Sequence, residues 1–296
     1  GRSIHDYDVT TSATPDEMME VFKGKRIIET GLQHGTITIV IDGEGYECTT
    51  YRIDGHYSDS RRPDSVTFTR SLEEDLKRRD FTINAMAKRT TDGEVIDILG
   101  GIDDIKSKKL RVLHDKSFED DPTRILRALK FSLRFGFTLD ENTARFQKEY
   151  LKNINYDMSY KRIKKELIET FNAPLSNITK EYKKQRTFER FINEKIYKLV
   201  TPNDVEIPSI NIEELVEKYC LDMDCHVANT PRNDEHIWLI YVGVLKDLSR
   251  LPLTKIEQKI LDDVPQNILN SDFELYKTFE NAKIETILLY AILKDP

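Results

Sequence analysis

Acidic residues near the N-terminus have the spacing of a metal site. Asp6 and Asp8 flank Tyr7 in a segment with strand character, so both carboxylates would project from one face. Mg²⁺ prefers carboxylate oxygens of this kind. Glu47 falls in a second strand, expected over residues 46–52, and would add a third carboxylate if the two strands are neighbours. Two ordinary alternatives stay open: Asp-x-Asp is common in surface loops, and Glu47 could pair with a cation across a sheet.

A second group combines cations, a carboxylate and an amide within one short run. Its members are Arg78, Arg79, Asp80 and Asn84. Guanidinium groups bind phosphate oxygens with a forked geometry, and Asp and Asn side chains can hydrogen-bond ribose hydroxyls. These residues therefore predict a site for a ribonucleoside triphosphate. The alternative is a helix terminus with ordinary ion pairing, where cations near the C-terminus also complement the helix dipole.

A third group has helical spacing. Asp121 and Arg124 lie three residues apart on one expected helix face, and Arg127 follows at the same spacing. A carboxylate accepts from the amino group of a base, and a guanidinium donates to a ring nitrogen or carbonyl. The pair could read a Watson–Crick edge without a nucleic-acid template, with Arg127 supporting the pair or a phosphate. The commoner meaning of this spacing is an intrahelical salt bridge.

The elements that must position these groups form an α/β head and a helical remainder. Thr14-Pro15-Asp16-Glu17 predicts a helix start with a capping box. Residues 36–41 alternate as a half-buried strand does, and the turn at 42–45 leads into the strand at 46–52. A helix is expected over 72–79. Beyond Gly100-Gly101, helical patterns cover residues 121–135, 141–152, 159–171, 187–200, 211–220, 235–249, 254–270 and 272–294.

Composition bounds the class of protein. The chain has 296 residues, enough for two or three domains, with 39% hydrophobic and 33% charged residues. Its longest apolar run, near residues 237–245, is too short to span a bilayer. The polar N-terminus has no signal-peptide pattern. We therefore expect a soluble protein without a membrane partner.

The cysteines argue against a disulfide framework. They are Cys48, Cys220 and Cys225, an odd number, which suits a reducing cytoplasm. Cys220 and Cys225 with His226 and His236 do not have the regular spacing of a zinc site, and we do not predict one.

Charge is distributed unevenly along the chain. The net charge is -7 overall, but residues 145–198 carry 14 Lys+Arg against 7 Asp+Glu, whereas residues 199–296 carry 9 against 18. A basic middle between acidic ends is typical of a polyanion site. A set of solvated Lys-rich helices would give the same count.

Taken together and in this order, the motifs are similar to those of a known family. The chain resembles the class II (bacterial-type) CCA-adding tRNA nucleotidyltransferases, which share a head with bacterial poly(A) polymerases. The resemblance runs from Arg2 to about Leu167 and rests on residues 5–15, 31–36, 78–87, 97–105, 120–137 and 159–167. The fold implied is α+β: a polymerase-β-like nucleotidyltransferase head with a mixed sheet, followed by an all-helical neck and body.

The resemblance also implies roles for single residues. Asp6, Asp8 and Glu47 match the catalytic, metal-binding carboxylates of the family, which uses Mg²⁺. Arg78, Arg79, Asp80 and Asn84 match its ribose and triphosphate motif. Asp121 and Arg124 match the protein template for CTP or ATP. Residues 54–63 match a flexible loop that supports the change from C to A addition, and Asp97, Gly100, Gly101 and Asp104 match a hinge.

Three departures from the family pattern stand out. The Gly-Gly-x-x-Arg-Asp segment that precedes the Asp pair is absent, and Gly1-Arg2 looks like its end. Asp120 stands where the template motif usually begins with Glu, for which we expect a modest effect. No tail domain is evident before Pro296, so we expect that the chain lacks pieces at both ends.

These observations lead to one main hypothesis for function. We expect a head at residues 1–105, a base-recognising neck at 106–172 and a tRNA-binding body at 173–296. The expected activity is CCA addition to tRNA 3′ ends from CTP and ATP, with release of pyrophosphate. The alternatives are a poly(A) polymerase, an A-only or C-only enzyme, and a catalytically inactive RNA-binding module. The oligomeric state is not predicted.

Overall fold

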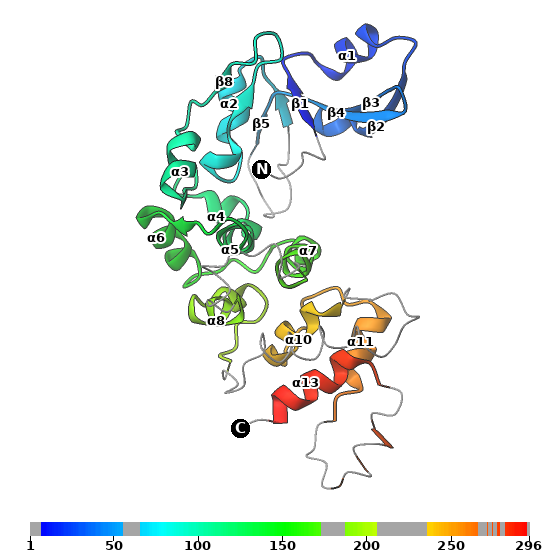
Figure 1. Cartoon of the computed structure of the whole chain (residues 1–296), viewed down its shortest axis with the longest axis vertical. Coiled ribbons are helices and arrows are strands. Elements are labelled where there is room, and N and C mark those ends of the chain that lie inside the picture. The colour runs from blue at the N-terminus through cyan, green and yellow to red at the C-terminus, as the bar shows by residue number, and fades with distance from the viewer. Residues whose placement is uncertain are drawn as a thin grey trace. The chain divides into compact units, whose positions relative to one another are not determined.

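The chain folds into two compact units. The computed structural model describes residues 7–55, 66–172, 187–205, 236–265, 271, 274, 277–278 and 282–294. One unit comprises residues 1–120 and the other residues 121–296. The first combines strands and helices, and the described residues of the second are mainly helical (Figure 1). The expected α+β class is confirmed, whereas the three-part division at residues 105 and 172 stays a prediction.

A four-stranded sheet forms the centre of the first unit. Its strands are β1 (Asp8–Thr11), β2 (Arg26–Gly31), β3 (Thr36–Ile41) and β4 (Glu44–Thr50), arranged in the order β1-β4-β3-β2. β1 runs parallel to β4, and the other pairs are antiparallel. Helix α1 (Pro15–Val21) packs on one face of this sheet, where Met18, Ile37, Ile39 and Cys48 are buried.

Local sequence explains the hairpin and the helix start. Asp42 and Gly43 both have positive φ and form the two-residue link between β3 and β4, which is the conformation that Asp-Gly favours in hairpins. The Thr14 side chain caps α1 by accepting from the Glu17 backbone N–H, and the Glu17 side chain accepts from the Thr14 backbone N–H in return. Both predictions are confirmed, although the strand expected at 46–52 ends at Thr50.

Shorter elements complete the first unit. β5 (Arg52–Asp54) pairs with β6 (Val66–Phe68), and β7 (Ala87–Lys88) pairs with β8 (Val95–Ile96). The helical segments are α2 (Leu72–Lys77), the 3₁₀ turns η1 (Leu32–His34) and η2 (Thr82–Asn84), α3 (Gly101–Ser107) and α4 (Ser117–Asp120), with the short strand β9 (Lys109–Leu110) between the last two helices.

Helices build the second unit around an apolar core. They are α5 (Thr123–Phe135), α6 (Glu141–Tyr150), α7 (Tyr160–Phe171), α8 (Thr187–Asn193), η4 (Ile196–Leu199), α10 (Trp238–Val242), η7 (Gly243–Leu245), α11 (Lys255–Asp262) and α13 (Ile284–Lys294); β10 (Thr138–Leu139) is a short strand. The apolar stripe predicted on α5 is buried, as Ile125, Leu126, Leu129 and Leu133 show. α5 packs against α7 and α8, and α10 against α7 and α13.

Several expected helices are shorter in the structure. The pattern over 187–200 is interrupted because Lys195 has a φ of 59°, which separates α8 from η4. The pattern over 235–249 gives α10 and η7 and stops at Lys246, whose φ is 61°. α11 ends at Asp262, ahead of Pro265, which disfavours helix at the preceding residue. Residues 211–220, and nearly all of 266–281, lie outside the described part of the chain.

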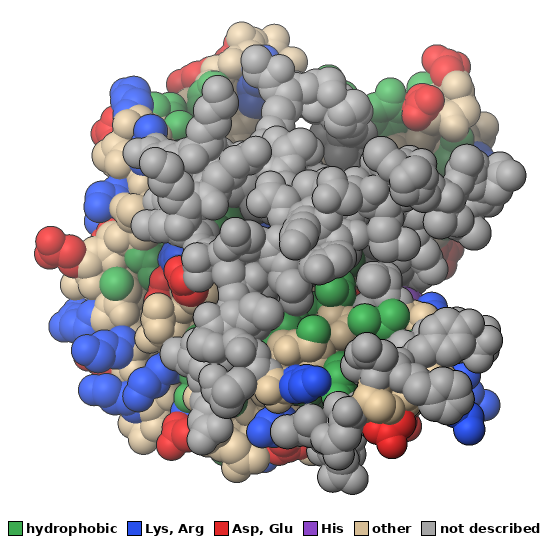
Figure 2. Space-filling view, turned by 60° about the horizontal axis from the view of Figure 1, so that its bottom comes forward, with side chains coloured by type: hydrophobic (Ala, Val, Ile, Leu, Met, Phe, Trp, Pro, Cys, Tyr) green, Lys and Arg blue, Asp and Glu red, His purple; other side chains and the backbone are tan. Residues whose placement is uncertain are grey.

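Charged side chains of both signs are visible among the described residues. In Figure 2, Lys and Arg side chains and Asp and Glu side chains both reach the surface of the face shown. Within the described ranges, no helix combines the length and apolar character needed to cross a membrane.

Candidate active site

Two carboxylates meet on the solvent face of the head sheet. The parallel register of β1 and β4 makes Asp8 and Glu47 direct neighbours. The next aligned pair, Val9 and Cys48, belongs to the opposite face, which packs on α1. Since aligned residues of neighbouring strands share a face, both carboxylates are on the exposed side, and both residues are exposed. Asp6, the third predicted member, lies outside the described residues.

The chemistry of this pair fits a hard divalent cation. Across the described ranges, neither Asp8 nor Glu47 has a side-chain hydrogen bond or ion pair, so the alternative of a cross-strand cation for Glu47 finds no support there. Carboxylate oxygens on strands about 4.8 Å apart can share one ion. Those ranges contain no group of three or more potential ligand side chains. Burial raises the pKa of the Cys48 thiol behind them, so Cys48 is a neutral core residue.

A buried carboxylate organises the predicted phosphate-binding arginines. Asp75 of α2 is fully buried, and its Oδ1 accepts from Nε and Nη2 of Arg78 at 3.0 and 2.8 Å. Its Oδ2 accepts from Arg79 at 3.5 Å, and Oδ1 also accepts from the Arg52 backbone at 3.2 Å. Burial and the Asp75 charge together raise the pKa of Tyr51. Arg78 is the C-cap of α2, so the ion pairing considered as the alternative is present.

Asp80 and Asn84, the predicted ribose-binding residues, hold each other. The Asp80 Oδ1 accepts from the Asn84 amide at 3.0 Å and from the Phe81 backbone at 2.8 Å. Asp80 is buried, and Asn84 ends the turn η2. Their geometry is therefore fixed by the protein itself.

The residues expected to form a hinge pack against η2, the turn that ends at Asn84. Asp97 accepts from the backbone of Gly101 and Ile102, both at 2.8 Å. Buried Asp104 accepts from the Thr82 hydroxyl at 2.6 Å, which ties α3 to η2. A Cβ on Gly101 would lie 2.4 Å from the Thr82 carbonyl oxygen, so only glycine allows this approach.

In the second unit, Asp121 is paired with α7. Its Oδ1 accepts from the backbone and hydroxyl of Thr123 at 3.1 and 2.6 Å, and its Oδ2 accepts from Nη2 of Arg162. Arg124, the proposed partner in base reading, is buried in the first turn of α5. Asp120, the residue where the family has Glu, lies in the first unit with its Oδ2 3.4 Å from Nε2 of His114.

Arg127 belongs to an ion-pair network between α5 and α7. Its Nη1 lies 3.5 Å from Oε1 of Glu166, and its guanidinium lies 5.2 Å from the ring centre of Phe131. Lys130 binds the other oxygen of Glu166 at 2.7 Å. Through these contacts Arg127 helps to join α5 to α7. Its support of the base-reading pair stays a prediction.

Two residues of these sites had no role in the sequence interpretation. Asp75 looks like an ordinary helical acid in sequence, yet its spacing of three and four from Arg78 and Arg79 could have signalled the pairing. Arg162 stands in the family-like segment 159–167, but nothing in its local sequence links it to Asp121. The loop at 56–65 and the residues Cys220, Cys225 and His226 lie outside the described part.

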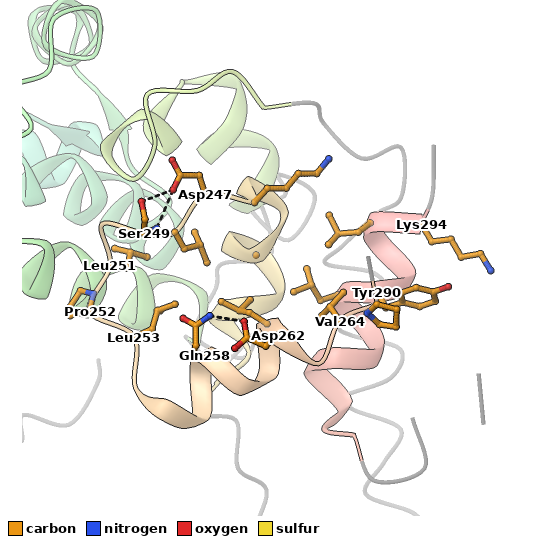
Figure 3. Close-up of a pocket in the computed structure, with 17 residues that line it drawn as sticks. Asp247, Ser249, Leu251, Pro252, Leu253, Gln258, Asp262, Val264, Tyr290 and Lys294 are labelled. Carbon is orange, nitrogen blue, oxygen red and sulfur yellow. Dashed lines mark hydrogen bonds between the residues drawn. The ribbon is translucent and has the colours of Figure 1, made fainter. Parts of the chain in front are cut away.

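A cavity of about 910 Å³ lies elsewhere in the second unit. Figure 3 shows its lining from η7, α11, α13 and the segment around residues 246–253, with Asp247 bonded to Ser249 and Gln258 to Asp262. Much of the lining is leucine, and none of the predicted site residues contributes to it. We assign it no part in the chemistry.

Comparisons with known proteins point to one family. The model of the poly A polymerase head domain matches residues 1–111. A CCA-adding enzyme of Lactobacillus helveticus is 33% identical over 315 aligned residues, covering 100% of this chain and 72% of that protein. The CCA-adding enzyme of Latilactobacillus sakei is 53% identical over 145 residues, which is 48% of this chain but only 36% of that relative.

Solved structures give the same picture of the fold. The crystal structure of the Bacillus stearothermophilus CCA-adding enzyme in complex with CTP is similar with a TM-score of 0.62 at 26% identity. The match covers 100% of this chain and 71% of that one. The similarity therefore extends over both compact units and well beyond the head.

Proposed function

The chain belongs to the family of CCA-adding enzymes, and from this premise we propose that it adds CCA to tRNA 3′ ends. The reaction is a template-independent nucleotidyl transfer from CTP and ATP that releases pyrophosphate. The expectation that the chain is an enzyme of the nucleotidyltransferase class agrees with this membership.

The observation that carries the proposal is the alignment of Asp8 with Glu47 on the exposed face of the head sheet. A carboxylate pair without side-chain partners in the described ranges suits a bound cation better than a structural role. Mg²⁺ held by Asp8, Glu47 and Asp6 would lower the charge of the triphosphate and favour ionisation of the attacking hydroxyl.

The remaining residues bind and orient the reactants. Arg78 and Arg79 hold the triphosphate and stabilise the charge that develops on the leaving pyrophosphate. Asp80 and Asn84 bind the ribose, which selects ribonucleotides. Because these side chains are already hydrogen-bonded within the protein, little reorganisation is needed when a nucleotide arrives.

Asp121 and Arg124 select the base, and Arg127 supports this pair. Asp121 accepts from the amino group present on both cytosine and adenine, and Arg124 donates to a ring acceptor. This explains how one protein could use CTP and ATP and reject UTP and GTP, whose corresponding position is a carbonyl.

The RNA partner is bound chiefly through phosphates. The basic segment 145–198 has the charge for this, and it begins in the proposed neck at 106–172 and extends into the proposed body at 173–296. Recognition by shape and phosphate predicts that affinity falls steeply with added salt. We also propose a cytoplasmic location, which the free, buried Cys48 suits.

The decisive experiment incubates the protein with tRNA that lacks its 3′ CCA, together with CTP, ATP and Mg²⁺. The RNA ends are then sequenced. Products that end in CCA and grow no further support the proposal. The Glu47→Gln variant serves as the matched negative control, since it keeps the size of the side chain and removes its charge.

Other products would change the assignment. Long A tails would identify a poly(A) polymerase. Addition of C alone or A alone would identify a single-nucleotide enzyme. Tight tRNA binding without any incorporation would identify an RNA-binding module.

A further inference from the structure

We propose that Arg162 is a positioning residue for base selection: it holds the Asp121 carboxylate so that one acceptor direction faces the amino group of the incoming base. This inference rests on the function proposed above and extends it. The selecting unit is then Thr123, Asp121 and Arg162 together, drawn from the start of α5 and from α7.

One oxygen of Asp121 is fully occupied by the protein. Oδ1 accepts from the backbone of Thr123 at 3.1 Å and from its hydroxyl at 2.6 Å. A carboxylate oxygen has two lone pairs, so these bonds use the acceptor capacity of Oδ1. An arriving base can bond only to the other oxygen.

The other oxygen is held from one side by Arg162. Nη2 of Arg162 lies 2.5 Å from Asp121 Oδ2 and 3.3 Å from the Thr123 hydroxyl oxygen. The guanidinium therefore fixes the rotation of the carboxylate and leaves one lone-pair direction on Oδ2. Arg162 approaches from a half-exposed position, with 43% of its side chain accessible against 14% for Asp121.

Thr123 and Arg162, the two residues that hold the Asp121 carboxylate, both lie on packed elements. Thr123 is buried, and Ile163 and Leu167 of α7 are fully buried against the core of the second unit. Lys130 of α5 bonds to Glu166 of α7 at 2.7 Å and also pairs with Glu169. α5 and α7 are therefore tied together independently of Arg162, so its removal should disturb the carboxylate more than the fold.

The geometry has a direct consequence for selectivity. A carboxylate oriented by two neighbours accepts from the N4 amino group of cytosine but faces the O4 carbonyl of uracil with unfavourable charge. A carboxylate that rotates freely can turn away from that carbonyl, which relieves the rejection of uracil. Arg162 should thus act on the preference for CTP over UTP, more than on binding of the triphosphate.

The test measures equilibrium binding of CTP and of UTP to the full chain by calorimetry, without tRNA. We expect the wild-type preference for CTP to fall about tenfold in Arg162→Met, through weaker binding of CTP and tighter binding of UTP. Thr123→Val, which removes the hydroxyl bonded to Oδ1 but keeps the shape, should give a smaller loss in the same direction. Arg162→Lys should restore part of the preference, since it keeps the charge without the fork.

Two controls separate positioning from general effects. Lys165→Met removes a cation from the same helix without touching Asp121, and it should leave the ratio of the two affinities unchanged. The variant with both Asp121→Ala and Arg162→Met should select no worse than Asp121→Ala alone, because Arg162 acts through Asp121. Thermal unfolding identifies any variant that fails to fold.

An unchanged preference in folded Arg162→Met, or an equal loss in Lys165→Met, would overturn the inference. So would a wild-type protein that binds CTP and UTP equally. The binding readout needs no turnover, so this failure is distinct from failure of the proposed function, which the sequencing of tRNA ends tests separately.

Discussion

Asp8 with Glu47 in the first unit and Asp121 in the second are all carboxylates with proposed contacts to the reactants, but the protein treats them differently. The first two stand on an exposed sheet face, and no side-chain partner engages them in the described ranges. Both oxygens of Asp121 accept hydrogen bonds, Oδ1 from Thr123 and Oδ2 from Arg162, and one acceptor direction remains on Oδ2.

The difference follows from what each carboxylate is proposed to bind. A cation that brings its own charge is attracted most strongly by uncompensated oxygens, so pairing Asp8 or Glu47 with a cation would weaken binding. A neutral base offers only a directional amino group, so the carboxylate gains from being oriented beforehand. Arg78 and Arg79 are likewise oriented before a ligand binds, because both hydrogen-bond to the Asp75 carboxylate.

Removing an open carboxylate should have the largest effect. Asp8→Asn keeps the size of the side chain but weakens the cation site, and we expect incorporation of CTP into tRNA to fall roughly 10³-fold or more. The measurement is the initial rate at saturating CTP over a range of Mg²⁺. Thr10→Val, on the same face of β1, is the control and should change the rate by only a few fold; near-normal activity in Asp8→Asn would contradict the metal assignment.

Removing the oriented carboxylate should act on choice of nucleotide. Asp121→Ala should lose about 10²-fold in selection of CTP over UTP while keeping a larger share of its turnover than Asp8→Asn does. Competition between labelled nucleotides in one reaction measures the ratio. A variant that loses turnover completely but keeps its selectivity would mean that the two carboxylates do not differ in the way inferred.

The buried carboxylate beneath the arginines should affect stability as well as binding. Asp75→Asn leaves Arg78 and Arg79 without their anionic partner, and we expect a loss of about 3 kcal/mol in the free energy of unfolding. The KM for CTP and ATP should rise together. Glu74→Gln, one residue away and exposed at its pairing with Lys77, is the control for denaturant unfolding; equal stability of the two variants would refute the anchoring role.

The smallest effect concerns an ion pair that has no part in the proposed chemistry. Burial alone would raise the pKa of Glu257, but hydrogen bonds from Lys164 and Thr254 outweigh it and hold that pKa below its usual range. A lowered carboxyl pKa gives stability that is present above the unfolded value and is lost as the pH falls through the folded value. The wild-type chain should therefore lose stability on acidification below about pH 4.3.

Glu257→Gln isolates this contribution. Glutamine can keep the capping bond to Thr254 but cannot pair with the Lys164 charge, so we expect a loss of about 1 kcal/mol at pH 7. The difference from wild type should shrink toward pH 3. Denaturant unfolding across that range measures it, with exposed Glu149→Gln as the control. A difference that stays constant with pH would argue against the charged pair.

Local patterns predicted several elements of both units well because their causes are local. The hairpin turn at Asp42-Gly43 and the cap at Thr14 depend on residues within one turn of each other. The buried stripe of α5 follows from helical spacing alone. Lys195 and Lys246 broke expected helices through positive φ values, which lysine rarely adopts and which the residue type at these positions did not predict.

The candidate sites were predicted unequally for the same reason. Asp8, Glu47 and Asp121 were predicted as candidates from type, spacing and family resemblance, and their roles stay predictions. Their partners were missed where the contact is long-range: Arg162 lies 41 residues from Asp121 in the chain. A single sequence does not encode such a contact in any periodicity, and it becomes visible only once α5 and α7 are packed.

The parallel pairing of β1 with β4 also governs when the carboxylate site can form during folding. The β3–β4 hairpin joins residues adjacent in the chain and can form within microseconds. β1 must instead close a loop across α1, β2 and β3 before Asp8 meets Glu47. A nascent head would therefore pair β3 with β4 before it acquires its proposed cation site, and on this proposal newly made chains would remain unable to transfer nucleotides until β1 docks.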